Sequence, residues 1–176
     1  MKKLIILNLI ILPFACIAQT VSNTLYMQMH DGKIYFDNAY SLDARLTKND
    51  LFARAVSWVK TAFNYPDAGV VLADEKKGEI TGTGIFKIFT GDAGHYYWLK
   101  FKVNIVVHNA TYELKAFDFY EKPIEPRVSN EYSKIEYRWW DYRQGKPWGV
   151  EDKPLFEGMN KDLNNMMASL QEAMSK

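Results

Sequence analysis

The sequence predicts an α+β fold: an antiparallel sheet of about five strands with two helices packed on one face. Three observations lead to this prediction. Residues 96–108 alternate strictly between a nearly all-apolar face and a mixed face, which is typical of a half-buried strand. Residues 51–63 and 156–174 repeat apolar side chains every three or four positions, which indicates amphipathic helices. The apolar strand face needs a cover, and the two helices can supply it.

The chain begins with a predicted secretory signal peptide over residues 1–18. Lys2 and Lys3 precede an apolar run over 4–15, and the small Ala18 stands before Gln19, where cleavage is predicted. The apolar run is too short for a good membrane span. We therefore expect an exported protein, periplasmic or extracellular, for which the membrane is only the route of export.

Cys16 leaves an alternative open, because a lipidated cysteine would anchor the chain in the envelope. Residues 13–15 lack the leucine and small-residue context that usually precedes such a cysteine. Cleavage after Ala18 would instead remove Cys16, the only cysteine of the sequence. The mature chain would then have no disulfide, no thiolate nucleophile and no zinc–thiolate site.

Residues 19–176 are predicted to form a single α+β domain with regular elements over 25–120 and 155–175. An irregular, aromatic-rich excursion is expected over 121–154, which holds four prolines. Without Lys2 and Lys3 the chain has 20 basic and 21 acidic residues. This balance lacks the basic excess of nucleic-acid-binding proteins, so no nucleic-acid partner is expected.

The strands are predicted from runs of β-branched and aromatic residues that turn residues separate. Asp31-Gly32 is a favourable turn dipeptide, and Asn109 suits a hairpin turn because asparagine tolerates left-handed backbone. Gly82 and Gly84 lie two apart in one strand, where glycine often marks a bend, a bulge or a close approach. The predicted strands cover residues 25–29, 34–42, 70–73, 79–89, 96–108 and 112–120.

Thr47 is the predicted N-cap of the first helix, with Asp50 three residues later in the capping-box position. This helix should end near Pro66, because proline disfavours helix at the residue before it. The closing helix carries a methionine stripe, which we interpret as core filler rather than a partner surface. Counting the first hairpin as one unit, the predicted order is β-α-β-β-β-β-α.

Several short motifs carry a resemblance to a known family. They are DGKIY at 31–35, KNDLFARA at 48–55 followed by Trp58, GEITGTG at 78–84 and FDF at 117–119. These segments resemble a family of secreted bacterial proteins known as a domain of unknown function with a TBP-like fold. The resemblance covers about residues 31–120 and the last helix. It implies the TBP-like fold but no activity, cofactor or catalytic residue, and a shared fold does not imply DNA binding.

The densest unusual feature is a cluster of aromatic and arginine side chains within the excursion. Such side chains can stack on sugars or partner residues, or they can fold back over the sheet as core. If residues 135–142 form a short strand, adjacent tryptophans face opposite sides and one of them should be exposed. The candidate partner-binding residues are Arg138, Trp139, Trp140, Arg143 and Trp148.

Two functions follow as hypotheses. The first is a non-enzymatic envelope module that binds a protein, a peptide or a glycan through the open sheet face and residues 139–148. The second is an envelope hydrolase that pairs His95 or His108 with a nearby carboxylate. The three histidines, His30 included, lie at predicted strand ends or turns without the close spacing of metal ligands. No metal, cofactor or catalytic residue is therefore predicted.

Overall fold

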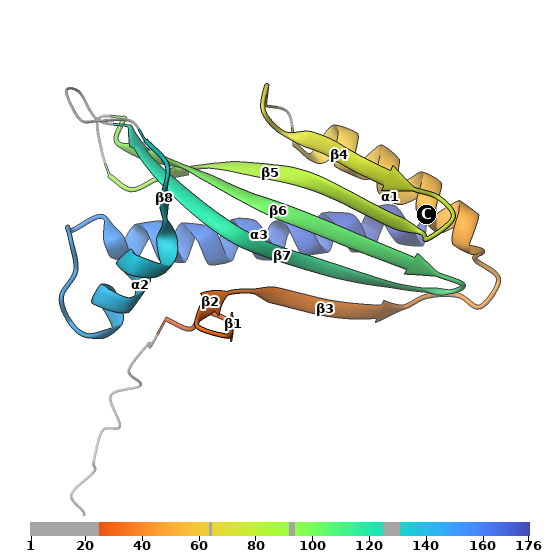
Figure 1. The fold of residues 1–176 in the computed structure, drawn as a ribbon, viewed down its shortest axis with the longest axis horizontal. Coiled ribbons are helices and arrows are strands. Elements are labelled where there is room, and N and C mark those ends of the chain that lie inside the picture. The colour runs from red at the N-terminus through yellow and green to blue at the C-terminus, as the bar shows by residue number, and fades with distance from the viewer. Residues whose placement is uncertain (1–24, 64, 92–93, 125–130) are drawn as a thin grey trace, which may run out of the picture.

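The computed structural model describes residues 25–63, 65–91, 94–124 and 131–176, and Figure 1 shows how their elements are arranged. The predicted signal peptide, its cleavage site at Ala18 and Gln19, and Cys16 lie outside these residues. Within them the elements are β1 (Met29–His30), β2 (Lys33–Ile34), β3 (Phe36–Ser41), α1 (Lys48–Ala62), β4 (Gly69–Asp74), β5 (Glu79–Phe89), β6 (Tyr96–His108), β7 (Thr111–Ile124), β8 (Ser133–Lys134), α2 (Ile135–Arg143) and α3 (Asp152–Ser175).

One antiparallel sheet organises the fold, with the strand order β3-β7-β6-β5-β4 and with β8 paired to β7. β5 and β6 pair continuously, from Glu79 opposite Val106 to Phe89 opposite Tyr96. The predicted antiparallel sheet of about five strands is confirmed, and β8 adds a sixth strand. β1 and β2 form a separate two-stranded hairpin.

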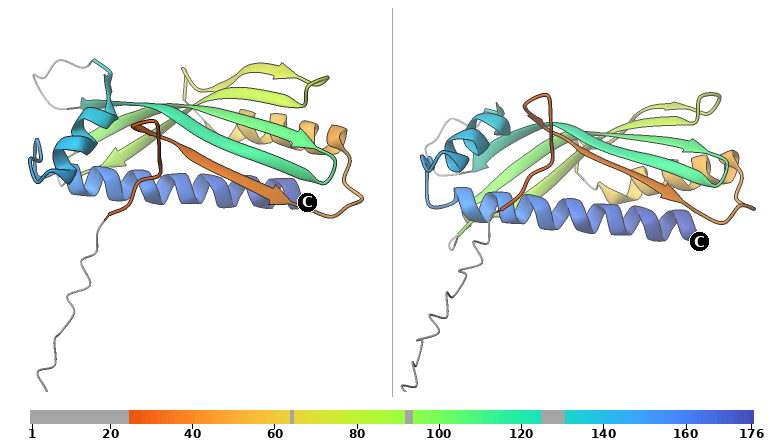
Figure 2. Two further views of the ribbon diagram at one scale, coloured as in Figure 1. Left: turned by 60° about the horizontal axis from the view of Figure 1, so that its bottom comes forward. Right: turned by 90° about the horizontal axis from the view of Figure 1, so that it is seen from below.

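The helices α1 and α3 lie side by side against one face of the sheet, as predicted (Figure 2). We call this the inner face and the opposite side the outer face. The odd-numbered side chains of β6 point to the inner face and are all buried: Tyr97, Leu99, Phe101, Val103, Ile105 and Val107. Met159, Met166 and Met174 of α3 are buried in the same core, which confirms the interpretation of the methionine stripe.

α1 begins with the predicted capping box. Thr47 accepts a hydrogen bond from the Asp50 N–H, and the Asp50 carboxylate accepts one from the Thr47 N–H, both at 3.2 Å. The predicted turn after His108 is confirmed, since Asn109 and Ala110 join β6 to β7, but the left-handed residue is Ala110, with a φ of 59°, rather than Asn109. Asn109 instead accepts a hydrogen bond from the Lys48 N–H at 3.0 Å, which joins the β6–β7 turn to the start of α1.

A β-bulge around Asp118 changes which side chains of β7 point inward. Asp118 and Phe119 both lie opposite Phe101 of β6, so β7 carries one extra residue here. Asp118 takes left-handed backbone with a φ of 55°. Before the bulge Ala116 is buried, and after it Phe119 and Glu121 are buried. The bulge therefore directs Tyr120 and its alternate neighbours to the outer face.

Gly82 and Gly84 confirm the predicted close approach of neighbouring groups in β5. A Cβ on Gly84 would collide with the ring of Phe101 on β6. A Cβ on Gly82 would lie 3.0 Å from Val59 of α1. The two glycines therefore let an aromatic ring and a helix pack directly on the strand backbone.

The prediction of a short strand over 135–142 is wrong, because this segment is the helix α2. Its aromatic residues favour strands on propensity, but tertiary packing overrides that preference. The side chains at helical spacing point toward the core: Ile135, Arg138, Trp139 and Tyr142. The prediction that 121–154 is an irregular excursion is likewise corrected, because β7, β8, α2 and the start of α3 occupy much of it.

The N-terminal hairpin has the predicted turn, in which Asp31 and Gly32 take φ values of 50° and 73°. The predicted strand over 25–29 is largely absent, because only Met29 of that range belongs to β1. In the part of the chain that the structure describes, no helix is both long and apolar enough to cross a membrane.

Candidate functional site

The five predicted partner-binding residues are divided between the core and the surface. Arg138 and Trp139 are 5% and 2% exposed, whereas Trp140 and Trp148 are 40% and 52% exposed. Arg143 is exposed as well. The prediction that Arg138 and Trp139 contribute to a partner-binding surface is therefore wrong, because α2 turns both toward the core.

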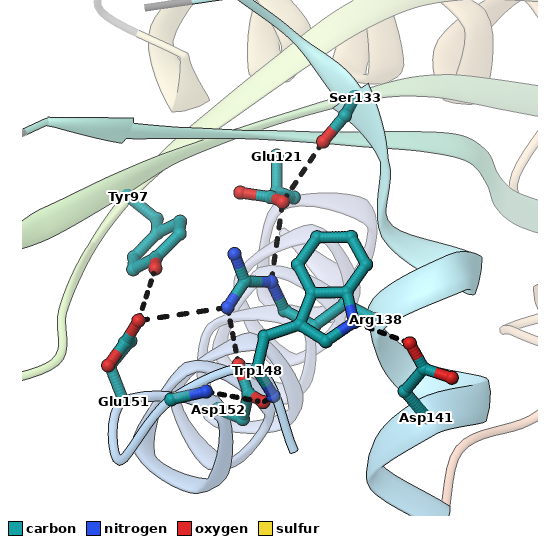
Figure 3. Close-up of polar contacts among 9 residues, drawn as sticks. Tyr97, Glu121, Ser133, Arg138, Asp141, Trp148, Glu151 and Asp152 are labelled. Atoms are coloured by element: carbon teal, nitrogen blue, oxygen red, sulfur yellow. Dashed lines mark hydrogen bonds and ion pairs between the residues drawn. The ribbon is translucent and has the colours of Figure 1, made fainter. Parts of the chain in front are cut away.

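Arg138 lies at the centre of a buried polar cluster formed by four elements (Figure 3). Its Nε is 3.3 Å from Oε1 of Glu121 on β7, and its Nη1 is hydrogen-bonded to Asp152 at the start of α3. Glu151 lies 3.9 Å from Nη1 and accepts a hydrogen bond from the Tyr97 hydroxyl of β6 at 3.1 Å. The cluster thus connects α2 and α3 to two strands of the sheet.

Trp148 closes this cluster from the solvent side. Its ring centroid lies 4.7 Å from the guanidinium carbon of Arg138, within cation–π range. Its backbone N–H donates to Asp152, and its indole N–H donates to Asp141 of α2. These contacts fold Trp148 back over the cluster, although half of its surface stays accessible.

The pKa values in the cluster reflect burial and charge. Burial raises the pKa of Glu121, although Arg138 and the Ser133 hydroxyl favour its charged form. Burial also raises the pKa of Tyr97. Burial alone would lower the pKa of Arg138, but the hydrogen bond to Asp152 and the charge of Glu121 raise it overall. The cluster is therefore a charged structural anchor for α2 and α3.

Trp139 and Trp140 confirm the expectation that one tryptophan is buried and its neighbour exposed, on a helix rather than a strand. Trp139 packs on Phe156 of α3 with ring centroids 4.9 Å apart. Trp140 is turned outward, and the guanidinium of Arg143 lies 5.2 Å from its ring centroid. Trp140 also lines a hollow of about 270 Å³ whose walls are Asp31, Gly32, Lys33, Asp118, Phe119, Tyr120, Lys134, Glu136, Tyr137 and Trp140.

A second concentration of aromatic rings lies on the outer face of the sheet. The strand register places Lys87, Trp98 and Lys122 in one row across β5, β6 and β7. Phe89 and Tyr96 form part of the next row, and Lys100 belongs to the row on the other side. With Tyr132, which directly precedes β8, we call these residues the aromatic–lysine platform: Lys87, Phe89, Tyr96, Trp98, Lys100, Lys122 and Tyr132.

Within the aromatic–lysine platform the lysines contact rings. The Lys87 Nζ lies 4.1 Å from the ring centroid of Tyr96 and 5.8 Å from that of Trp98. Lys100 and Lys122 approach the ring of Tyr132, at 5.6 and 5.4 Å. These distances are typical of cation–π interactions.

The charges on the outer face are distributed unevenly. Beside the platform, Lys102 is paired with Asp118 at 2.7 Å, and farther along the sheet Lys115 is paired with Glu113 at 3.3 Å. Among the described residues no carboxylate lies within ion-pair distance of the three platform lysines. The pKa of the Tyr132 hydroxyl is raised mainly by burial, and the negative charge of Asp67 raises it further. The platform is therefore an aromatic surface with excess positive charge.

The platform was not predicted, although the alternation over 96–108 already contains part of it. Tyr96, Trp98 and Lys100 lie on its even-numbered face, opposite the buried odd-numbered face, and all three are partly exposed. Trp98 is partly exposed on the outer face, where its ring meets that of Tyr65. Its row partners on β5 and β7 become visible only with the strand register.

The histidines named in the hydrolase hypothesis do not form a pair with a carboxylate in a hollow of the described structure. His108 ends β6, and His95 directly precedes that strand. Neither side chain has a carboxylate partner among the described residues. His30 lies 3.3 Å from its neighbour Asp31, but both side chains are largely exposed at the hairpin turn. Within the described residues no group of three potential ligands is placed to hold a metal ion.

Comparison with known proteins identifies the fold. Residues 44–122 match a family described as a domain of unknown function, DUF4468, with a TBP-like fold. The structure is similar to the crystal structure of a DUF4468 family protein from Bacteroides ovatus ATCC 8483, with a TM-score of 0.71 and 14% identity over 85% of this chain and 91% of that one. It is also similar to a TBP-like protein from Parabacteroides distasonis ATCC 8503, with a TM-score of 0.71 and 16% identity over 84% of this chain and 96% of that one. Curated proteins gave no significant match.

Proposed function

We propose that this chain, whose residues 44–122 form a DUF4468 domain with a TBP-like fold, is an exported, non-enzymatic module that binds a glycan. The family description names no activity, so the proposal rests on the surface of this chain. The observation that supports it is the aromatic–lysine platform on the outer face. The helices α1 and α3 cover only the inner face (Figure 2), and on the outer face Phe89 and Tyr132 are exposed while the other platform residues are partly exposed.

The chemistry of the platform favours a glycan over the protein and peptide partners considered above. Ring faces such as those of Trp98 and Tyr96 can stack on the apolar faces of sugar rings, and lysine donates hydrogen bonds to hydroxyl groups. The centre of a protein–protein interface, in contrast, is depleted in lysine. A peptide that adds a strand needs a free strand edge, whereas the platform is a sheet face.

The surface around Trp140 is the natural extension of the platform. Tyr120 lies beside Lys100 in the sheet and lines the hollow that contains Trp140. Tyr120 also lines a smaller hollow of about 140 Å³ with Lys100 and Lys102. A ligand chain on the platform can therefore continue past Tyr120 toward Trp140 and Arg143.

Co-sedimentation with insoluble envelope polysaccharide tests the proposal. The wild-type protein should sediment with the polysaccharide, and Trp98→Ala should lose most of this binding while it keeps its melting temperature. Tyr26→Ala, at an aromatic residue that is 75% exposed and whose carbonyl accepts a hydrogen bond from Asn160 of α3, is the control and should still bind. Equal binding by wild type and Trp98→Ala, or binding only to protein or lipid vesicles, would contradict the proposal.

Export is a separate part of the proposal, because the predicted signal peptide lies outside the described residues. N-terminal sequencing of the protein recovered from the producing cells should give Gln19 as the first residue. A mature chain that begins with a diacylated Cys16 would instead show a lipid-anchored envelope protein. An uncleaved chain in the cytoplasm would contradict export.

A further inference from the structure

We infer that the glycan is acidic, and that Lys87, Lys100 and Lys122 bind its carboxylate groups. This inference rests on the proposed glycan-binding function and names the chemical class of the ligand. The inference rests on the arrangement of charges on the outer face. The three platform lysines contact aromatic rings and have no described carboxylate at ion-pair distance, whereas Lys102 and Lys115 on the same face are ion-paired.

The strand register gives the three lysines a defined spacing. Lys87 and Lys122 flank Trp98 in one row, on strands that are two positions apart. Neighbouring strands are separated by about 4.8 Å, so the two lysine backbones are roughly 10 Å apart. Lys100 lies diagonally from Lys122, roughly 7–8 Å away by the usual geometry of antiparallel pairs. A central ring with cations on both sides suits a sugar chain that carries charges beside its apolar ring faces.

The immediate surroundings of these lysines also favour an anion. The ammonium groups near Tyr132 and Tyr96 interact with rings, and within the described part of the chain they have no carboxylate at ion-pair distance. A ligand carboxylate would supply that charge and form charge-assisted hydrogen bonds. Lys102, one row from Lys100, differs from the platform lysines because its charge is already neutralised by Asp118, whose carboxylate lies 2.7 Å from its Nζ. Among the described residues, the lysines of this face that lack an ion-pair partner are therefore those at the end of the sheet where the rings gather.

Single-stranded nucleic acid also combines negative charge with flat rings, but the structure favours it less. Proteins that bind single strands use a positively charged groove that follows the backbone. Within the described residues the platform has three lysines, and Lys102 and Lys115 farther along the face are paired with acids. The full sequence has a formal charge of only +1. We therefore treat oligonucleotide binding as an outcome that would overturn the inference.

The test uses one sugar backbone with and without its charge. Isothermal titration of the wild-type protein with tetragalacturonic acid and with its methyl ester should show at least about tenfold tighter binding of the acid at low salt. This preference should shrink as salt is added, because salt screens exposed charges. Lys100→Gln with Lys122→Gln should lose the preference, whereas Lys100→Arg with Lys122→Arg should keep it. Lys153→Gln, on α3 away from the platform, should behave like the wild type.

Each outcome separates this inference from the proposed function. Equal binding of the acid and the ester would overturn the acidic ligand but support glycan binding. Binding of neither sugar at millimolar concentration would overturn both. Tighter binding of an eight-residue thymidine oligonucleotide than of the acid, lost in the double glutamine variant, would replace the glycan with nucleic acid. The melting temperatures of all variants must match the wild type for the comparison to hold, and the arginine variant provides a second folded reference.

Discussion

The guanidinium of Arg138 on α2 lies 3.3 Å from Oε1 of Glu121 on β7, and both side chains are nearly excluded from solvent. Removing one member of such a pair leaves an uncompensated buried charge, and Asp152 would lose its partner as well. Arg138→Met should therefore lower the free energy of unfolding by about 3–5 kcal/mol. Urea unfolding measures this, and the exposed Arg143→Met should change it by less than about 0.5 kcal/mol. Similar values for both variants would show that the cluster does not anchor α2.

Glu121 should make stability depend on pH in a defined direction. Because burial raises its pKa in the folded state, the folded protein keeps this proton to higher pH than the unfolded chain does. The contribution of Glu121 to stability is therefore full below the ordinary carboxyl pKa and is lost as the pH rises through the raised value. Urea unfolding of the wild type and of Glu121→Gln, between about pH 4 and about pH 7, checks the sign.

In that experiment the wild-type free energy of unfolding, minus that of Glu121→Gln, should fall as the pH rises. Groups that both proteins share cancel in this difference, so it isolates Glu121. A difference that rises with pH would mean that Arg138 outweighs burial and lowers the pKa of Glu121.

Trp139 and Trp140 should respond oppositely to truncation. Trp139→Ala removes a buried ring that packs on Phe156, and it should cost about 3–5 kcal/mol of folding free energy. Trp140→Ala should cost roughly 1 kcal/mol or less, because Trp140 is turned outward and 40% of its surface is exposed. Thermal unfolding of both variants provides the comparison. Equal destabilisation would assign both rings to the core and remove Trp140 from the proposed binding surface.

Gly84 should not tolerate even one added methyl group. A Cβ at this position would collide with the ring of Phe101, whose side chain is fixed in the core. Gly84→Ala should therefore cost about 1–3 kcal/mol through overpacking. Gly91→Ala is the matched control, since a Cβ there meets no atom within 4 Å. If the two variants have the same melting temperature, Phe101 has room to move that the packing does not show.

Most helices and strands could be predicted because the pattern that identifies each of them lies within one continuous stretch of the sequence. The alternation of β6 and the apolar spacing of α3 each reflect a single buried face, and Thr47 with Asp50 marks the start of α1 locally. α2 has no such clear signal, because its inward side includes Arg138. An arginine is buried only when distant residues neutralise it, and its partners come from β7 and α3.

The candidate site was predictable only in part for a related reason. The exposure of Trp140 was expected from strand alternation, whereas it results from helical spacing, since Arg138 and Trp139 before it are both buried. The aromatic–lysine platform, in contrast, combines residues from β5, β6 and β7 in rows that depend on the strand register. Whether Lys122 faces the ligand side or the core depends on the bulge at Asp118, which strict alternation does not predict.

That bulge has a consequence for how the gene can change. Deleting Asp118 would leave Phe119 alone opposite Phe101, so β7 would alternate regularly and its pairing with β6 would be continuous. Phe119 and Glu121 would still face the core, and Tyr120 and Lys122 would still face outward, so Arg138 would keep its counterion. The loss would be confined to the Asp118 carboxylate, which is the ion-pair partner of Lys102. Asp118 is therefore the position at which evolution can shorten this strand without changing the face of any other side chain.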